Sequence, residues 1–249
     1  MNTYKPELSV VIPIFDEEEN IFPLLEELTT ALDKLGRAFE IICVDDASRD
    51  HSREKLADFG TREPRLKIVF HRRNCGESAA TASGFHRARG RYIITMDGDL
   101  QNDPADIPNL LARIEKQGVA AVCGVRRRRE DDWVKRLSSR AANTFRNLVT
   151  GDRIRDAGCT FRILRRDALR EIPIFNGMHR FLPTLLRLQG YEVEELLVNH
   201  RLRRLGVSKY GIGNRLFRGL VDCLAMRWWQ SRCVPGQRCR DGQPQAAGD

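Results

Sequence analysis

The chain has 249 residues, 41% of them hydrophobic, which is enough to bury the core of one large α/β domain. No C-x-x-C spacing occurs among its seven cysteines, which disfavours a zinc site or a disulfide framework. Because the segment Met1 to Leu8 is polar and no apolar run reaches the roughly 18 residues that span a bilayer, the sequence predicts a cytosolic protein.

The formal charge of +8 is distributed unevenly along the chain. Residues 1–125 contain 16 basic and 21 acidic residues, whereas residues 126–249 contain 26 basic and 13 acidic residues. Such an asymmetry indicates that the second half meets an anion, which could be nucleic acid, a phosphorylated small molecule or a membrane surface. Arg makes up 35 of the 42 basic residues, and its planar fork suits phosphate, although genomic base composition could produce the same bias.

Strand and helix patterns alternate through the first half of the chain. A short β-branched run, Leu8–Ile14, is followed by a helical pattern of leucines that ends at Gly36. Further strands are predicted at Glu40–Asp45, Lys67–Phe70, Tyr92–Met96 and Val119–Val125, and further helices near 50–60, at Glu77–Ala88 and at Pro104–Gln117. This alternation predicts an α/β fold with a Rossmann-like, mostly parallel sheet and helices on both faces.

Three of the predicted strands end in acidic or polar residues. These ends are Phe15-Asp16-Glu17, Asp45-Asp46 and Asp97 to Gln101. Because the carboxyl ends of parallel strands meet at one edge of a sheet, we expect the three ends to form one pocket. The fingerprints G-x-G-x-x-G and G-x-x-x-x-G-K-[ST] are absent, which disfavours ordinary dehydrogenases and P-loop NTPases.

The stretch R-Y-I-I-T-M-D-G-D-L-Q-N-D-P, residues 91–104, is the strongest candidate for a site. In a nearly extended chain the alternation of Asp97, Asp99 and Gln101 turns three oxygen-bearing side chains to one side. Carboxylate and amide oxygens suit Mg²⁺ or Mn²⁺, which leaves its other positions to water and substrate phosphates. The alternative is a capped turn at the strand end, and we assign Asp103 and Pro104 to that role.

Six motifs together carry a family resemblance. They are V-V-I-P-I-F-D-E-E-E-N (10–20), V-D-D-A-S-R-D (44–50), R-N-C-G-E (73–77), M-D-G-D-L-Q-N-D-P (96–104), R-D-A-G-C-T-F-R (155–162) and H-R-L-R-R-L-G-V-S-K-Y (200–210). The first four resemble the nucleotide-sugar half of family 2 glycosyltransferases, which have the GT-A fold. The last two resemble the polyprenyl-phosphate branch, which includes the dolichyl-phosphate mannosyltransferases. The chain departs from the family pattern at Asp16, Ala47 and Cys159, where Asn, Gly, and Gly or Ser are usual.

The resemblance implies a site for a nucleotide diphosphate sugar, with UDP or GDP left open. The implied donor-binding residues are Pro13, Phe15, Glu17, Asp45, Asp46 and Asp97. Asp99 and Gln101 would hold the Mg²⁺ or Mn²⁺ ion, which stabilises the leaving diphosphate as a Lewis acid. Inversion at the anomeric carbon would follow from direct displacement.

The acceptor determines which other groups the site needs. A lipid monophosphate is already anionic, so it requires cations and no carboxylate base. By motif position the acceptor residues are predicted to be Arg136, Arg140, Arg203 and Lys209, and the catalytic residues Asp97, Asp99, Arg126 and Arg203. Much of the remaining basic sequence, such as 127–129, 153–155 and 165–166, is assigned to a solvated surface.

The C-terminal region predicts an amphipathic helix over residues 212–232, with Leu224 and Trp228 on its apolar face. Such a helix can lie in a bilayer interface, but packing on the domain or pairing with a second copy fits equally well. We therefore divide the chain into a GT-A domain at 1–211, this helix, and a tail at 233–249 whose composition predicts disorder. Within the domain, residues 1–125 form the nucleotide-sugar half and residues 126–211 the acceptor half.

The favoured function is an inverting glycosyltransferase that moves a sugar to a polyprenyl phosphate at the cytoplasmic face of the membrane, as a peripheral protein. One alternative keeps the donor and uses a hydroxyl acceptor, although the chain lacks the Q-x-x-R-W run of polysaccharide synthases in this family. A second alternative is a non-enzymatic module that binds nucleic acid or membranes through its basic half. The oxygen-rich set Asp97, Asp99 and Gln101 argues against that module and against a nucleic-acid partner, because a binding module needs no metal site.

Overall fold

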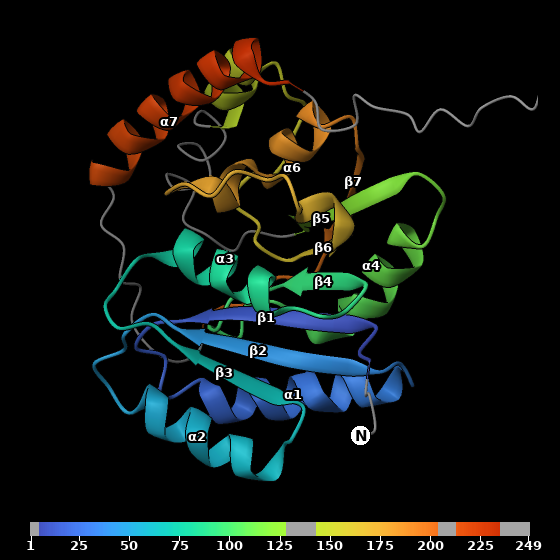
Figure 1. Cartoon of the computed structure of the whole chain (residues 1–249), viewed down its shortest axis with the longest axis vertical. Coiled ribbons are helices and arrows are strands. Elements are labelled where there is room, and N and C mark those ends of the chain that lie inside the picture. The colour runs from blue at the N-terminus through green and yellow to red at the C-terminus, as the bar shows by residue number, and fades with distance from the viewer. Residues whose placement is uncertain (1–4, 128–142, 204–212, 235–249) are drawn as a thin grey trace, which may run out of the picture.

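The computed structural model describes residues 5–127, 143–203 and 213–234 (Figure 1). The first half alternates strands and helices in the predicted order. Its elements are β1 (Leu8–Ile14), α1 (Ile21–Lys34), β2 (Phe39–Asp45), α2 (Ser52–Arg62), β3 (Leu66–Phe70), α3 (Glu77–Arg87), β4 (Tyr92–Thr95), the 3-10 turn η1 (Pro104–Asp106), α4 (Ile107–Ile114) and β5 (Val119–Arg126). The predicted helix at 104–117 is thus a 3-10 turn followed by two turns of α-helix.

The second half adds elements that the sequence patterns did not reveal, except for the last helix. They are β6 (Arg162–Arg165), the 3-10 turn η2 (Asp167–Leu169), α6 (Met178–Leu188), β7 (Glu192–Val198) and α7 (Gly213–Arg232). Residues 143–150 are also helical. Within the described parts of the chain, no helix combines the length and the hydropathy that crossing a bilayer requires.

The strands form one seven-stranded sheet in the order β3-β2-β1-β4-β6-β5-β7. Only β6 runs antiparallel to its neighbours β4 and β5, whereas β1 pairs in parallel with β2 and β4, and β5 pairs in parallel with β7. The predicted α/β fold with a mostly parallel sheet and helices on both faces is confirmed (Figure 1).

The central strands are buried on both faces, which explains their continuous apolar sequences. In β1, Val10 and Ile12 pack in the same cluster as the leucines of α1, whereas Val11 packs in a cluster with Ala80 of α3. Helix α3 approaches the sheet closely at Gly84, where an added Cβ would lie 2.2 Å from Val11 Cγ1. This close approach positions the first turn of α3 beside the carboxyl ends of the strands.

The chain turns sharply after three of the strands. Asp16, Ala47 and Leu100 are the described non-glycine residues with positive φ, at 51°, 61° and 62°, and they follow β1, β2 and β4. Two hydrogen bonds join the turn after β1 to the turn after β2. Arg49 N–H donates to Asp16 Oδ1 at 2.6 Å, and Asp16 N–H donates to Ser48 Oγ at 2.9 Å. Gly and Asn, which the resembled family pattern has at the positions of Ala47 and Asp16, adopt this left-handed conformation more readily than other residues do.

We expect Ala47→Gly to raise the free energy of unfolding by up to about 1 kcal/mol, because glycine adopts positive φ without the clash of a Cβ atom. Urea unfolding followed by circular dichroism measures the change. Ala57→Gly, at an exposed position inside α2, is the matched control and should lower stability by about 1 kcal/mol. An equal loss of stability in both variants would contradict the strain assigned to Ala47.

Candidate active site

The carboxyl ends of β1, β2 and β4 lie at one edge of the sheet, as their parallel register requires. Arg203, from the segment after β7, joins two of these ends. Its Nη2 atom lies 2.8 Å from Glu17 Oε1 and 3.4 Å from Asp99 Oδ2. The predicted convergence of strand ends is therefore seen for Glu17 and Asp99, and the partly buried guanidinium of Arg203 lies between the two carboxylates.

The segment that carries Arg203 is hydrogen-bonded to the loop after β4. Gln101 Nε2 donates to the carbonyl oxygen of Arg201 at 3.1 Å, and Arg201 N–H donates back to Gln101 O at 2.9 Å. The Arg201 guanidinium forms a fork on Glu27 at 2.8 and 2.7 Å and contacts Asp103 at 2.7 Å. Asp103 also caps η1, as predicted, by accepting from Ala105 N–H.

Asp99 and Gln101 form a donor set that fits a hard divalent cation. Gln101 N–H donates to Asp99 Oδ1 at 3.2 Å, so the two residues are held next to each other. Because the Gln101 amide nitrogen is the donor to Arg201, its oxygen is the atom that could bind a cation. One carboxylate and one amide oxygen match the few protein ligands that Mg²⁺ or Mn²⁺ needs when phosphates supply the rest.

Asp97 lies deeper than Asp99 at the end of β4. Its backbone N–H donates to Asn102 Oδ1 at 2.8 Å, and its Oδ2 accepts from Thr160 Oγ1 at 2.6 Å. Burial, together with the negative charges of Glu77 and Asp99, raises the pKa of Asp97 to about 7. A cation bound nearby would favour the charged form again.

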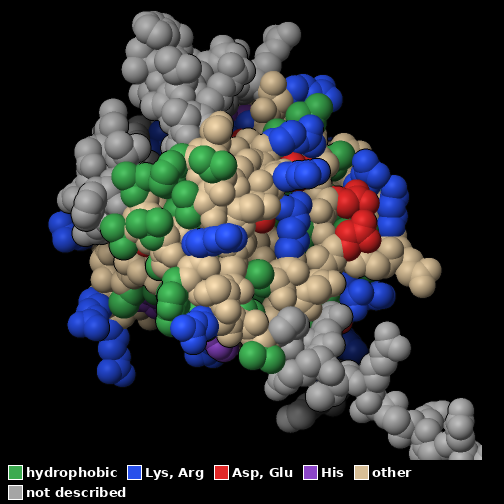
Figure 2. Space-filling view, turned by 90° about the horizontal axis from the view of Figure 1, so that it is seen from above, with side chains coloured by type: hydrophobic (Ala, Val, Ile, Leu, Met, Phe, Trp, Pro, Cys, Tyr) green, Lys and Arg blue, Asp and Glu red, His purple; other side chains and the backbone are tan. Residues whose placement is uncertain are grey.

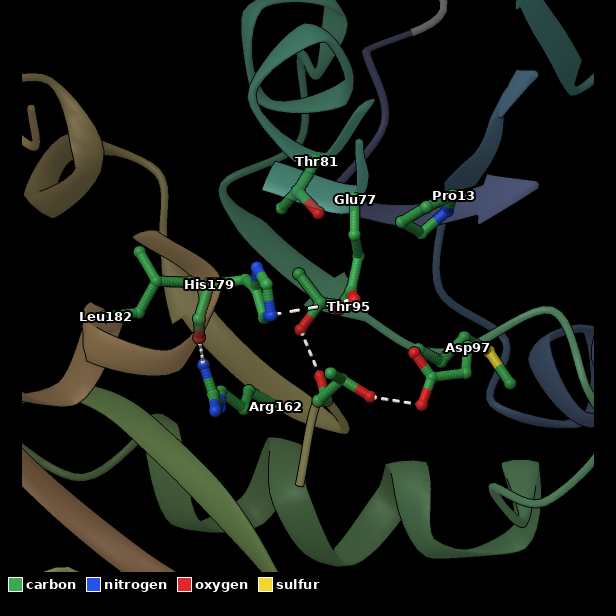
Figure 3. A pocket seen from close by; sticks show the side chains of 10 residues that line it. Pro13, Glu77, Thr81, Thr95, Asp97, Arg162, His179 and Leu182 are labelled. Carbon is green, nitrogen blue, oxygen red and sulfur yellow. Dashed lines mark hydrogen bonds and ion pairs between the residues drawn. The ribbon is translucent and has the colours of Figure 1, made fainter. Parts of the chain in front are cut away.

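A small pocket adjoins Asp97 (Figure 3). It lies between β1, β4, α3 and α6 and is lined by Pro13, Glu77, Thr81, Thr95, Met96, Asp97, Thr160, Arg162, His179 and Leu182. The predicted donor-binding residues Pro13 and Asp97 both belong to this lining, whereas Phe15 lies half-buried beyond the end of β1.

Asp45 and Asp46, the predicted ribose and base ligands at the end of β2, are both buried. Asp45 accepts from Arg53 Nε at 2.6 Å and from Ser48 N–H. In this structure its carboxylate holds the turn after β2, and its contact with a nucleotide stays a prediction.

Asp46 fastens the loop before α3. Its two oxygens accept from Cys75 N–H at 2.8 Å and Gly76 N–H at 2.7 Å, and His71 Nδ1 lies 2.7 Å from Oδ1. The ligand atoms of Asp46, His71 and Cys75 lie within 4.8 Å of one another, as in a metal site. These hydrogen bonds account for the cluster without an ion.

Arg126, which was predicted to reach a phosphate from the end of β5, is paired with a carboxylate in this structure. Its guanidinium forms a fork on Asp156, with Nε and Nη2 at 2.7 and 2.8 Å from the carboxylate oxygens. The pair fastens the loop that carries Thr160. The direct phosphate role of Arg126 stays a prediction, and the predicted acceptor residues Arg136, Arg140 and Lys209 lie outside the described residues.

The pocket residues that the sequence reasoning did not predict include Glu77, Thr160, Arg162 and His179. Glu77 and Thr160 stand inside motifs that carried the family resemblance, so those motifs contained the signal for them. Arg162 closes one of the same motifs and is almost completely buried, with 1% of its surface exposed. His179 belongs to no motif that we recognised, and it reaches the site only through the packing of α6 on α3.

Comparisons with known proteins give three kinds of likeness. The sequence profile of the family described as Glycosyl transferase family 2 matches residues 9–173. The chain is 37% identical to the dodecaprenyl-phosphate galacturonate synthase of Rhizobium johnstonii, over 90% of this chain and 67% of that protein. It is 35% identical to the undecaprenyl-phosphate 4-deoxy-4-formamido-L-arabinose transferase of Edwardsiella ictaluri, over 87% of this chain and 67% of that protein.

Among solved structures, the fold is similar to glucosyl-3-phosphoglycerate synthase from Mycobacterium tuberculosis in complex with Mn²⁺, UDP and phosphoglyceric acid. The TM-score is 0.68 at 17% identity, over 93% of this chain and 80% of that chain. A mannosyltransferase from Pyrobaculum calidifontis, in complex with GDP-Man and Mn²⁺, gives a TM-score of 0.60 at 18% identity, over 93% of this chain and 66% of that chain.

We expect Arg203→Ala to strengthen the binding of Mn²⁺ to the nucleotide-free protein by about threefold to tenfold. The substitution removes a positive charge 3.4 Å from Asp99 Oδ2, in a site that solvent screens in part. Titration of free Mn²⁺ by electron paramagnetic resonance measures the affinity. Arg201→Ala removes a neighbouring arginine paired with Glu27 and Asp103, and it should change the affinity much less. Unchanged or weaker Mn²⁺ binding in Arg203→Ala would show that this guanidinium does not compete for Asp99.

Proposed function

The chain belongs to glycosyl transferase family 2, and from this membership we propose that it transfers a sugar from a nucleotide diphosphate sugar to the phosphate of a polyprenyl lipid. The supporting observation is the contact of Arg203 with Glu17 and Asp99. It places a guanidinium and two carboxylates beside the Asp97 pocket at one edge of the sheet. Direct displacement of the diphosphate at this edge would invert the anomeric carbon.

The lipid acceptor is supported by the names of the two relatives, which are both polyprenyl-phosphate sugar transferases. They differ in the sugar, galacturonate in one and a formamido-arabinose in the other, so they do not assign the sugar of this chain. A phosphate acceptor is ionised at neutral pH and attacks without a general base. It requires cations near the anomeric carbon instead, and Arg203 is the described arginine best placed for that role.

The donor would bind with its diphosphate beside Asp99 and Gln101. These two residues would hold a divalent ion, which when bound stabilises negative charge on the leaving diphosphate. Glu17, Phe15 and Pro13 from the end of β1 would contact the nucleoside. Asp45 and Asp46 would shape that subsite through the turn and the loop that they hold.

A membrane-facing surface would bring the lipid to this site. Helix α7 packs on the domain through Cys223 and Met226 but exposes Leu224 and Trp228, by 60% and 62%. Leu148 of the adjoining helical segment 143–150 is 82% exposed, and Gln230 of α7 donates to Thr150 O at 2.7 Å. Hydrophobic side chains gather over α7 with Lys and Arg nearby (Figure 2). We propose that this surface, defined by Leu148, Leu224 and Trp228, contacts the cytoplasmic face of the bilayer as a peripheral site.

We expect Asp99→Asn to lower sugar transfer by about a hundredfold or more, because the neutral amide holds a divalent cation weakly. The assay measures transfer of radiolabelled sugar from a panel of UDP- and GDP-sugars to undecaprenyl phosphate, and EDTA should reproduce the loss. Asp58→Asn, at an exposed ion pair on α2, is the matched control and should keep full activity. Full turnover in EDTA would refute the metal role, and absence of transfer to any polyprenyl phosphate would refute the proposed function.

We expect the double substitution Leu224→Ser and Trp228→Ser to weaken binding to anionic phospholipid vesicles by tenfold or more. Moving each apolar side chain from water into the membrane contributes about 1.5–3 kcal/mol to the free energy of binding. Vesicle flotation measures the bound fraction, and Leu197→Ser, at an exposed leucine on the edge strand β7, serves as control. Equal flotation of the double variant would assign the surface to contacts with protein, such as a second copy of the chain.

A further inference from the structure

Three side chains of different ligand types meet beyond the ends of β2 and β3. Asp46 follows β2, His71 follows β3, and Cys75 lies in the loop before α3. Their ligand atoms are a carboxylate oxygen, an imidazole nitrogen and a thiol sulfur, and these atoms lie within 4.8 Å of one another. The cluster shares no residue with the Asp99 and Gln101 set, so it is a second candidate for a metal site.

The hydrogen bonds that hold the cluster without an ion also supply what a metal-binding histidine needs. His71 Nδ1 lies 2.7 Å from Asp46 Oδ1, and Nε2 lies 2.9 Å from Ser83 Oγ on α3. A histidine that binds a metal through one ring nitrogen usually donates its other ring N–H to an oxygen, which fixes the tautomer. The Ser83 hydroxyl can accept that bond from Nε2, so Nδ1 can give up its proton and bind an ion beside Asp46.

The carboxylate and the imidazole are both held in place by the backbone. Asp46 Oδ1 accepts from Cys75 N–H at 2.8 Å, and Oδ2 accepts from Gly76 N–H at 2.7 Å. His71 N–H donates to the carbonyl oxygen of Asp45 at 2.9 Å. Ligands supported in this way by strand ends and backbone donors are arranged for an ion before it arrives.

Cys75 completes the ligand set and gives an ion access from solvent. Its side chain is exposed, and its thiol makes only a long contact of 3.4 Å with the carbonyl oxygen of Arg73. Sulfur and nitrogen ligands favour Zn²⁺ over Mg²⁺, which prefers oxygen. A thiolate, a carboxylate and a neutral imidazole balance the charge of a divalent ion, and three protein ligands leave the fourth position of tetrahedral Zn²⁺ to water.

We propose that Asp46, His71 and Cys75 bind one Zn²⁺ ion, which clamps the loop before α3 onto the ends of β2 and β3. Ser83 is a positioning residue that fixes the His71 tautomer. The absence of C-x-x-C spacing does not exclude this site, because the fold assembles it from two strand ends and a loop. The proposal does not depend on sugar transfer, and its test requires none.

The experiment titrates the full-length protein with Co²⁺ in excess Mg²⁺, which occupies sites made of oxygen alone. A bond between Co²⁺ and a thiolate gives a charge-transfer absorption band in the near ultraviolet. The protein should show this band at one equivalent of Co²⁺, and added Zn²⁺ should displace it. Cys75→Ser, at an exposed position that leaves the fold intact, should abolish the band.

Substitutions of the other residues test the ligand set and its support. His71→Asn keeps a side-chain amide beside Asp46 but removes the imidazole, and it should weaken Zn²⁺ binding by more than about tenfold. Ser83→Ala should weaken binding by about tenfold, at the low end of the usual effect of losing a partner of a metal ligand. Cys233→Ser, at a partly exposed cysteine, and His86→Asn, at an exposed position on α3, are matched controls and should keep the wild-type affinity.

A second measurement tests the clamp. Zn²⁺ should slow amide hydrogen exchange in the loop 72–76, and it should have no such effect in Cys75→Ser. Absence of the band in the unsubstituted protein, a band that persists in Cys75→Ser, or wild-type affinity in His71→Asn would overturn the proposed site. Exchange in the loop that stays the same with bound Zn²⁺ would overturn the clamp.

Discussion

Negative charge concentrated at one edge of a parallel sheet is the constraint on which this site depends. Glu17, Asp45, Asp46, Asp97 and Asp99 follow strands that the fold brings side by side. Each carboxylate needs a donor or a cation, because an unpaired charge in a partly dry site is costly. The structure meets this need with Arg53, with Arg203, with the Thr160 hydroxyl, and with the backbone N–H groups of Cys75 and Gly76. The turns and loops around the site are held by the same bonds.

Not every arginine of the second half is available to bind an anionic substrate. Several arginines of the second half are bound to nearby carboxylates and do not form an open basic surface. Arg126 pairs with Asp156, Arg146 with Asp152 and Arg155 with Glu195. The expectation of a solvated surface at 153–155 therefore holds only in part, because Arg155 is exposed but also paired. These three pairs leave the net charge of the second half unchanged, whereas Arg201 and Arg203 pair with Glu27 and Glu17 of the first half and so neutralise part of the asymmetry.

The sequence predicted most of the first half because local patterns determine it: the apolar strands, the leucine stripe of α1 and the acidic strand ends each lie within a dozen residues. The second half was harder. β6 is four residues long, and its antiparallel place between β4 and β5 depends on long-range pairing. β7 carries Glu192, Glu194 and Glu195, residues that disfavour strand predictions. The contact between Glu77 and His179 joins residues about a hundred positions apart, and no spacing rule anticipates it.

On the proposed function, substrate binding at this edge becomes an exchange of counter-charges. In the structure the Arg203 guanidinium lies 2.8 Å from Glu17 and 3.4 Å from Asp99, the carboxylate that would hold a divalent ion. An ion held by Asp99 would weaken the attraction of Arg203 to that carboxylate and leave its positive charge for the diphosphate, where such a charge is useful in the transition state. Arg203 would thus balance the carboxylates before the donor binds and the diphosphate afterwards. Its segment is held in place by Arg201 and Gln101 through contacts that do not involve Asp99, so Arg203 can move while its backbone stays anchored.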